Sequence, residues 1–236
     1  MTKQKRILLL RALQYIFHSL YFNFHYLPFK QAIRLPILLY KPDLLCCGGR
    51  ILLQPEDGRI RTGMIQMGFR MVSIFPNSGI TWENNGGTVI FRGHCRLGNG
   101  MAVSFGKHTT VEFGDDFLCT TSGKIVSYRG IKFGRSMRLG WDSLCMDTNF
   151  HPLYDMKAKR YKSASAPIEI GDYNWFGSKC TILPGVKTPE RCIFGLGTVI
   201  TRGCEAKSYC VMGGSPVRVL AENVMRDYNH DTEEDV

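Results

Sequence analysis

The sequence predicts an all-β solenoid, a parallel β-helix with a helical extension before it and a short helix after it. Two observations lead to this fold. Residues at every sixth position from Ile170 onward are mostly bulky and apolar: Ile170, Phe176, Ile182, Thr188, Phe194, Ile200, Ala206 and Met212. Residues four positions further on in each hexad are mostly small: Asn174, Cys180, Val186, Cys192, Thr198, Cys204 and Cys210. A period of six fits neither an α-helix nor a single flat strand, and it is typical of a chain that turns a corner after each short face.

The composition fits one such solenoid with extensions. The chain has 236 residues, 44% of them hydrophobic, and contains 25 glycines, which is enough for a sizeable core in one domain. The nine cysteines are odd in number, several occupy the small station of the repeat, and no cleavable signal peptide is evident. We therefore expect free, buried thiols and a cytoplasmic location.

The formal charge of +10 is concentrated at the start of the chain. Residues 1–42 contain seven Lys and Arg side chains and no Asp or Glu, whereas the last residues are acidic. A basic segment favours an anionic neighbour, either a membrane surface or a phosphorylated substrate. No nucleic-acid recognition motif accompanies the charge, so we expect no nucleic-acid partner.

Residues 1–42 are expected to form a basic, apolar helical extension. The pattern from Lys3 to Phe22 predicts a helix with a narrow polar stripe. The uncharged run over residues 12–29 contains too many polar residues for a membrane span. The broad apolar face of this helix either packs on the solenoid or a sister subunit, or makes a peripheral membrane contact through residues 3–22. The sequence leaves these alternatives open.

The repeat then defines the remaining boundaries. Residues 43–87 are expected to form an irregular, β-rich capping region, and residues 88–220 the β-helix. The repeat changes phase several times before Cys145, which a solenoid tolerates because insertions loop outward. It breaks over residues 151–167, a loop rich in basic side chains, and resumes at Ile168. Residues 221–236 are expected to form the C-terminal helix and an acidic tail.

Three motifs resemble those of the hexapeptide-repeat acyltransferases, in the branch that O-acetylates cell-envelope polysaccharides. They are GWDSLCMDTNFHPL at residues 140–153, IEIGDYNWFGSKCTILPGV at residues 168–186, and GLGTVITRG with VMGGSPVRVL at residues 195–203 and 211–220. The resemblance implies a left-handed β-helix, an exception to the usual right-handed crossover. It also implies a homotrimer with acyl-CoA bound in the groove between subunits.

The resemblance implies that His151 is the catalytic base. An imidazole that titrates near neutrality suits removal of a hydroxyl proton as the oxygen attacks a thioester. Such a base needs a partner on its other ring nitrogen to orient it. Asp147 and Asp142 are the nearby carboxylates and Asn149 is a further candidate, and the sequence does not choose among them.

Other motif positions are implied to bind acetyl-CoA, the expected co-substrate. By resemblance, Trp175 lines the groove near the acceptor or the pantetheine arm. Small residues let the pantetheine approach the backbone, and two arginines stand where the family places basic residues near the CoA phosphates. The full set is Trp175, Gly177, Ser178, Gly195, Gly197, Arg202 and Arg218.

The sequence thus predicts an acetyl-CoA-dependent O-acetyltransferase acting on a sugar hydroxyl of a cell-surface polysaccharide precursor, either free or lipid-linked. The alternatives are an acetyltransferase acting on serine or on an amino group of a nucleotide sugar, and a non-catalytic β-helix scaffold. A γ-type carbonic anhydrase would need three metal-binding histidines from adjacent coils. His94, His108 and His151 are not spaced for such a site, and no metal is expected.

Overall fold

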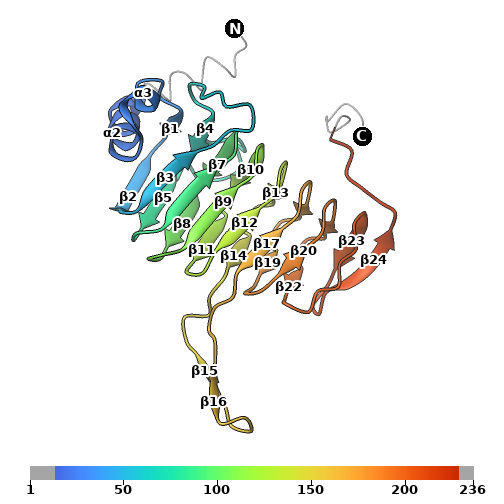
Figure 1. The fold of residues 1–236 in the computed structure, drawn as a ribbon. Helices are drawn as coiled ribbons and strands as arrows, with labels where there is room; N and C mark the ends of the chain where they lie inside the picture. The colour runs from blue at the N-terminus through green and yellow to red at the C-terminus, as the bar shows by residue number, and fades with distance from the viewer. Residues whose placement is uncertain (1–13, 229–236) are drawn as a thin grey trace.

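Residues 14–228, the part of the chain that the computed structural model describes, wind largely into a β-helix with three parallel sheets (Figure 1). Sheet A contains β1 (Ile37–Leu39), β4 (Ile65–Met67), β7 (Cys95–Asn99), β10 (Phe117–Thr121), β13 (Arg138–Leu139), β18 (Trp175–Phe176), β21 (Ile193–Phe194), β23 (Cys210–Gly213) and β24 (Arg218–Glu222). Sheet B contains β2 (Pro42–Cys47), β5 (Ile80–Asn84), β8 (Met101–Phe105), β11 (Lys124–Ser127), β14 (Leu144–Met146), β19 (Thr181–Ile182) and β22 (Val199–Ile200). Sheet C contains β3 (Arg50–Leu53), β6 (Thr88–Phe91), β9 (Thr110–Phe113), β12 (Ile131–Phe133), β17 (Ile168–Ile170) and β20 (Lys187–Thr188).

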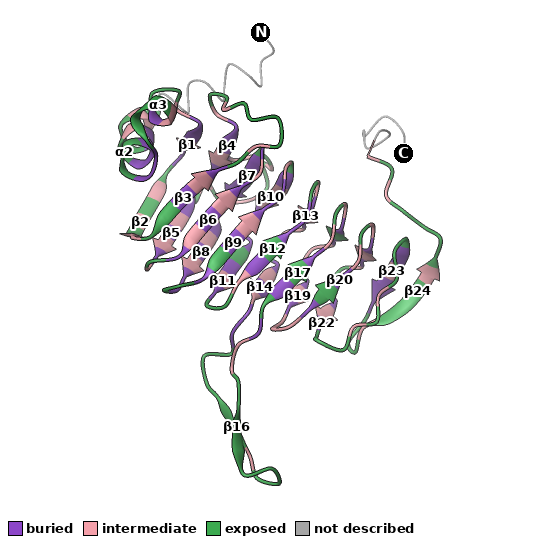
Figure 2. Ribbon diagram, viewed as in Figure 1, coloured by how far each residue is buried: buried purple, intermediate pink, exposed green. Residues whose placement is uncertain are grey.

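The core is a stack of inward side chains that parallel pairing holds in register. In sheet C, Phe91 pairs with Phe113 and Phe113 with Phe133. The ring of Phe113 stacks on these neighbours at centroid distances of 5.2 Å and 5.4 Å. All residues at the bulky station of the repeat are buried except Ala206, and all at the small station except Cys204. The six-residue pattern is therefore confirmed as the pattern of the core, and Figure 2 shows buried and more exposed residues alternating along the strands.

The corners between sheets use the left-handed backbone conformation at many residues other than glycine. Positive φ angles occur at His108, Asp116, Ser122, Ser136, Asp142, Phe150, Tyr173, Lys179, Arg191 and Tyr209. This conformation costs a non-glycine residue about 1–2 kcal/mol. Hydrogen bonds between neighbouring coils oppose that cost; for example, the backbone N–H of Arg191 donates to the carbonyl of Asp172 at 2.8 Å. The corners thus accept many residue types other than glycine.

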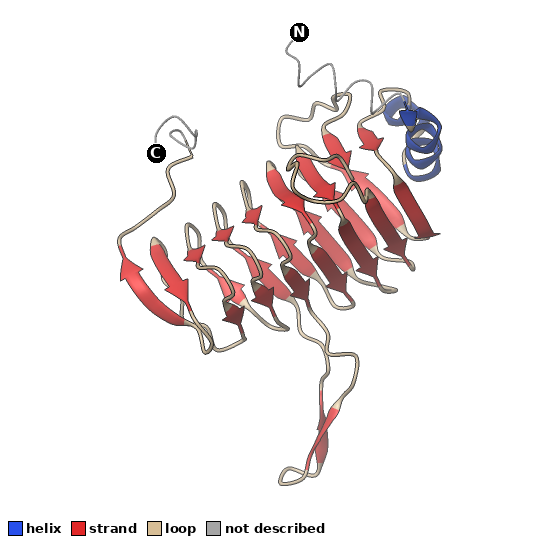
Figure 3. Ribbon diagram, turned by 180° about the vertical axis from the view of Figure 1, so that it is seen from behind, coloured by secondary structure: helices blue, strands red, loops and turns tan. Residues whose placement is uncertain are grey.

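Helices α2 (Ile16–Tyr26) and α3 (Phe29–Ala32) cover the first end of the solenoid (Figure 3). The helix expected over residues 3–22 lies partly outside the described residues, and the described helix continues to Tyr26. Asn23 is fully buried; its amide nitrogen donates to the carbonyl of Ile37 at 2.7 Å, and its oxygen accepts from the N–H of Ile37 at 3.2 Å. Ser19 Oγ accepts from the N–H of Leu39 at 2.9 Å. Helix α2 therefore supplies hydrogen-bonding partners for the backbone groups at the edge of β1. In the rest of the solenoid, the preceding coil supplies them.

The β-helix begins earlier and ends differently from the expected boundaries. Strands β1 and β4 already pair in sheet A, β2 and β5 pair in sheet B, and β3 pairs with β6 in sheet C, so the coils start at Ile37, and residues 43–87 are part of the solenoid. At the other end, β24 runs antiparallel to β23. Residues 221–228 contain the end of β24 and irregular chain where a helix was expected. Residues 229–236, and with them the end of the acidic tail, lie outside the described part.

Residues 151–167 interrupt the coils as expected, between β14 and β17. They include β15 (Leu153–Asp155) and β16 (Arg160–Lys162), which pair antiparallel as a hairpin that projects away from the body (Figure 1). Within residues 14–228, none of the helices has the length and apolar character needed to cross a membrane.

Candidate functional site

His151 lies at the corner where the chain leaves β14 of sheet B and enters the hairpin. Its side chain is exposed, and its backbone N–H donates to the carbonyl of Asn149 at 2.7 Å. The preceding residue, Phe150, adopts a φ angle of 60°, and its ring meets that of Tyr128, from the corner one coil earlier, edge-on at 5.2 Å. Among residues 14–228, the imidazole has no hydrogen-bonding partner. It is therefore accessible to a ligand and is not oriented by another side chain within the described residues.

The carboxylate of Asp147 is fully buried and holds the corner of the preceding coil. Oδ1 accepts from the N–H of Tyr128 at 2.7 Å. Oδ2 accepts from Ser127 Oγ at 2.8 Å, from the N–H of Arg129 at 2.9 Å and from the N–H of Gly130 at 2.7 Å. Both oxygens are thus occupied by the 127–130 turn, and the structure does not bring this carboxylate to His151. Asp147 instead fixes the backbone from which His151 projects.

The other two candidate partners are also separate from the imidazole. Asp142 is exposed at the corner that precedes β14, on the opposite edge of sheet B from His151. The backbone N–H of Asn149 donates to the carbonyl of Ala164 at 2.8 Å, which ties the two ends of the hairpin together. Its side chain is exposed and faces the cavity described next.

A cavity of about 550 Å³ lies between the base of the hairpin and the following coils. It is lined by Asn149, by residues 160–166, and by two later corners of the same edge, at residues 183–184 and 201–202. Three basic side chains contribute to it: Arg160, Lys162 and Arg202. Of these, Lys162 forms an ion pair with Asp155 at 3.0 Å. The structure thus brings Asn149 and Arg202 together and adds Arg160 and Lys162, which the sequence shows only as members of a basic loop.

The four small residues implied to line the cofactor groove lie along the corners between sheets A and B. The N–H of Gly197 donates to the carbonyl of Ser178 at 2.9 Å, which joins two consecutive corners. Gly197 has a φ angle of 74°, and a Cβ there would meet nothing within 4 Å. A Cβ at Gly177 would come within 2.9 Å of the backbone nitrogen of Leu196. Gly197 therefore borders open space, whereas Gly177 is required by the close packing of the coils.

Trp175 and Arg218 lie apart from His151. Trp175 points outward from sheet A and is 37% exposed, with the guanidinium carbon of Arg226 at 4.6 Å from its ring centroid. Arg218 is exposed at the start of β24. The expected site residues of one chain are therefore divided between the two edges of sheet B and the outer surface of sheet A.

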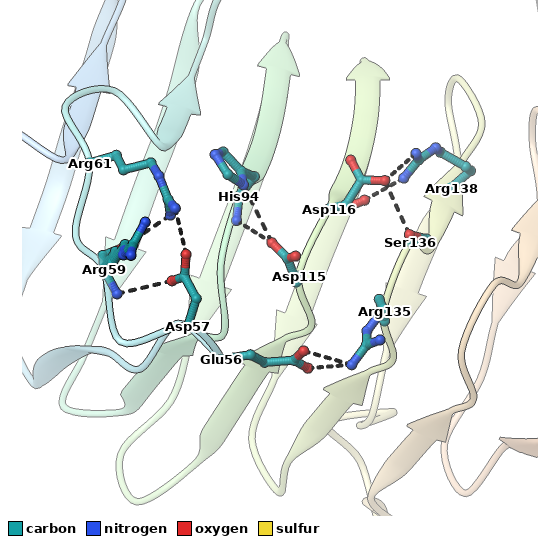
Figure 4. Close-up of polar contacts among 10 residues, drawn as sticks. All are labelled: Glu56, Asp57, Arg59, Arg61, His94, Asp115, Asp116, Arg135, Ser136 and Arg138. Carbon is teal, nitrogen blue, oxygen red and sulfur yellow. Dashed lines mark hydrogen bonds and ion pairs between the residues drawn. The ribbon is translucent and has the colours of Figure 1, made fainter. Parts of the chain in front are cut away.

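A second hollow, of about 590 Å³, lies outside sheet C and contains mostly paired charges. Figure 4 shows the loop that borders it: both carboxylate oxygens of Glu56 accept from Arg135 at 2.7 Å, and Asp57 pairs with Arg61. The Glu56–Arg135 pair joins the loop to a later coil, whereas Asp57 and Arg61 both belong to the loop. Within the described residues, no group of three or more His, Cys, Asp or Glu side chains is placed to hold a metal ion.

The fold and the site define a parallel β-helix protein with an exposed histidine and a basic cavity at one edge. Hexapeptide-repeat acetyltransferase homologues match this chain in sequence. Over 128 residues the chain is 26% identical to galactoside O-acetyltransferase of Escherichia coli (strain K12), covering 54% of this chain and 62% of that protein. Over 126 residues it is 22% identical to polysialic acid O-acetyltransferase of Escherichia coli O1:K1 / APEC, covering 53% and 38%.

The matched segments span less than two thirds of either relative. Among solved structures, a polySia-specific acetyltransferase aligns over 82% of this chain and 92% of its own, with 16% identity and a TM-score of 0.47. No protein-family model matches the chain.

Proposed function

We propose that the protein transfers the acetyl group of acetyl-CoA to a hydroxyl of a sugar in a cell-surface polysaccharide precursor, either free or lipid-linked. The observation that carries the proposal is the placement of His151. It is exposed at a corner that the buried Asp147 carboxylate joins to the preceding coil, two residues after Asn149, which lines the basic cavity. The names of the two sequence relatives, which describe O-acetylation of a galactoside and of polysialic acid, support a carbohydrate acceptor.

In the proposed mechanism His151 is the general base. Its free ring nitrogen takes the proton of the acceptor hydroxyl while the hydroxyl oxygen forms an ester bond with the acetyl carbonyl carbon. The bond from that carbon to sulfur breaks, and the imidazolium returns the proton to the leaving thiolate. Acetyl-CoA supplies the activated acyl group. Arg160 and Arg202 add positive charge beside the site, which suits an anionic group on either substrate.

We also propose that the site is completed in a homotrimer of left-handed coils, as the resemblance implies. The division of the expected residues between two edges of sheet B supports this arrangement, because a second subunit can bring one edge to the other. From β8 to β22 the outer surface of sheet B is uncharged except at Lys124. Its outward residues are in register in two columns: Ala102, Lys124, Leu144, Thr181 and Val199 form one, and Ser104, Val126 and Met146 form the other. The outer surface of sheet C alternates in charge along Glu112, Lys132, Glu169 and Lys187, so sheet B is the better candidate for a subunit contact.

The cofactor-binding part of the proposal assigns Trp175, Gly177, Ser178, Gly195, Gly197, Arg202 and Arg218 to acetyl-CoA. Gly197 supports it best, because it leaves room for a ligand beside the backbone. If Arg218 contacts a CoA phosphate, Arg218→Ala raises the KM for acetyl-CoA more than it lowers kcat, the pattern of lost uniform binding. An equal KM in both proteins would make Arg218 a solvated charge.

We place the proposed reaction in the cytoplasm. All nine cysteines are free thiols, and six of them are buried. Burial raises the pKa of the Cys180 thiol to about 11, so this side chain acts as a small apolar residue and not as a nucleophile. Such use of cysteine is typical of proteins in a reducing compartment.

The test incubates the protein with acetyl-CoA and a panel of acceptors: galactosides, sialic acid oligomers, a nucleotide amino sugar and serine. Thiol release and the mass of the product are measured. His151→Asn is expected to lower kcat by on the order of 10²–10⁴-fold while acetyl-CoA still binds. His108→Asn, at an exposed corner two coils earlier on the same edge, is the matched control and keeps full turnover.

Full turnover in His151→Asn would remove His151 from the mechanism. Acetylation of serine or of the amino sugar alone would assign a different acceptor class. Binding of acetyl-CoA without transfer to any acceptor in the panel would favour a non-catalytic scaffold.

A further inference from the structure

We infer that the outward face of the two N-terminal helices docks on an anionic lipid bilayer. This face, called the α2–α3 face, consists of Phe17, Tyr21, Phe24, Phe29 and Ile33. The inference concerns where the protein lies and not its chemistry, so it stands or falls independently of the proposed acetyl transfer.

Helix α2 has a buried face and an exposed face with different roles. One face is buried on the first coil through Ser19, Phe22, Asn23 and Tyr26. The opposite face remains exposed: Phe17 is 80% exposed, Tyr21 54% and Phe24 45%. These three residues are spaced by four and three positions, so they lie along one side of the helix. Packing against the solenoid therefore accounts for the buried side of this helix but not for its exposed aromatic side.

Helix α3 and the residue that follows it extend the exposed face. Phe29 is 70% exposed and Ile33 is 55% exposed. The ring centroids of Phe24 and Phe29 lie 5.9 Å apart, so the two helices present one continuous group of aromatic side chains. Contiguous exposed apolar groups of this kind mark interaction surfaces, and an exposed Phe-rich face on a basic helix is typical of helices that lie in the headgroup region of a bilayer.

The charge around this face is positive and is not compensated by ion pairs. Lys30, Arg34 and Lys41 are exposed, and none forms an ion pair with another residue of the 14–228 segment. Arg34 donates to the carbonyl of Ile60 at 3.3 Å and Lys41 to the carbonyl of Asn77 at 2.9 Å. Four further Lys and Arg residues precede the face in sequence, and residues 1–42 contain no carboxylate side chain.

This combination matches an anionic bilayer better than a second copy of the chain. Basic side chains near a surface are attracted to anionic headgroups while aromatic side chains enter the interface. A two-fold contact between copies would bring the same basic segment of each subunit together, and like charges at an interface disfavour association. The α2–α3 face also lies at one end of the solenoid, so docking there leaves the projecting hairpin free (Figures 1 and 3).

The structure also determines which variants can test the inference. Deletion of residues 1–22 would remove Ser19 and Phe22, which cover the first coil, so loss of binding could follow from misfolding. Point substitutions on the exposed side avoid this problem. Phe17→Ser with Phe29→Ser reduces the aromatic surface, and Lys30→Glu with Arg34→Glu reverses charge. Ile74→Ser and Lys107→Glu, at exposed positions outside the N-terminal helices, are the matched controls.

The experiment sediments the full chain with vesicles of phosphatidylcholine and phosphatidylglycerol, and with vesicles of phosphatidylcholine alone. Wild-type protein and both controls are expected to bind the anionic vesicles and to bind less at high salt. Each double variant is expected to bind at least about ten-fold more weakly while keeping the wild-type thermal unfolding midpoint.

Three outcomes would overturn the inference. In the first, the wild-type protein does not sediment with anionic vesicles. In the second, the Phe17 and Phe29 double variant binds them as well as wild type does. In the third, the wild-type protein self-associates through this face without binding vesicles and the same double variant abolishes that association, which would make a second copy the occupant.

Discussion

Replacing Asp147 by asparagine tests whether this residue holds the corner below His151. The carboxylate is fully buried and accepts four hydrogen bonds, three of them from consecutive backbone N–H groups of the preceding coil. An asparagine side chain has one acceptor oxygen. If that oxygen takes the place of Oδ2, the amide nitrogen faces the N–H of Tyr128, two donors meet, and that backbone group loses its acceptor.

The expected cost follows from these contacts. An unsatisfied buried N–H costs about 1–3 kcal/mol, and hydrogen bonds to a charged group are stronger than neutral ones by about 1 kcal/mol each. Removing a buried charge offsets part of this loss. We expect Asp147→Asn to lower the free energy of unfolding by about 2–4 kcal/mol, a large share of the roughly 5–15 kcal/mol that stabilises a typical protein.

Urea unfolding at a fixed protein concentration measures this loss. With a slope of about 2 kcal/mol per molar urea, the middle of the usual range, the midpoint is expected to fall by about 1–2 M. Asp142→Asn is the matched control, because Asp142 is an exposed corner residue with a φ angle of 55° that asparagine also tolerates, and its midpoint should not change. An unchanged midpoint in Asp147→Asn, together with a large fall in kcat, would refute the structural role and make Asp147 a partner of the imidazole.

Further predictions concern the first strand, a buried cysteine and a surface ion pair. Asn23→Ala removes both hydrogen bonds to Ile37 and should lower the free energy of unfolding by about 2–3 kcal/mol; an unchanged melting temperature would contradict this. Burial raises the pKa of the Cys180 thiol from 9.0 to about 11. The contribution of this thiol to the free energy of unfolding is therefore complete below pH 9 and is lost as the pH rises towards 11. Urea midpoints should therefore fall between about pH 9 and pH 11, and pH-independent midpoints would contradict the prediction. Glu56→Gln breaks an exposed ion pair with Arg135 and should leave the midpoint unchanged, whereas a clear fall would show that the pair secures the loop.

Part of the candidate site could be predicted from the sequence because the relevant residues are close together in it. The interruption over residues 151–167 follows from the hexad pattern, and the choice of His151 as the candidate base follows from the resemblance of residues 140–153 to the family motif. The cavity could not be predicted in this way. It combines Asn149 and Arg160 with Arg202, and their proximity depends on how the hairpin leaves the body and on the next two coils lying directly after it.

The sequence by itself determined the β-helix and its core, because a six-residue period decides locally which side chains point inward and which sit at corners. Only the tertiary structure decided which residues meet between coils. Asp147 contacts a turn 17 to 20 residues earlier, and Asn23 satisfies a strand 14 residues later. The physical reason is that coil length varies with each outward insertion. The residues that stack on one another are therefore fixed by strand register and by hydrogen bonds between coils. A single repeat contains neither.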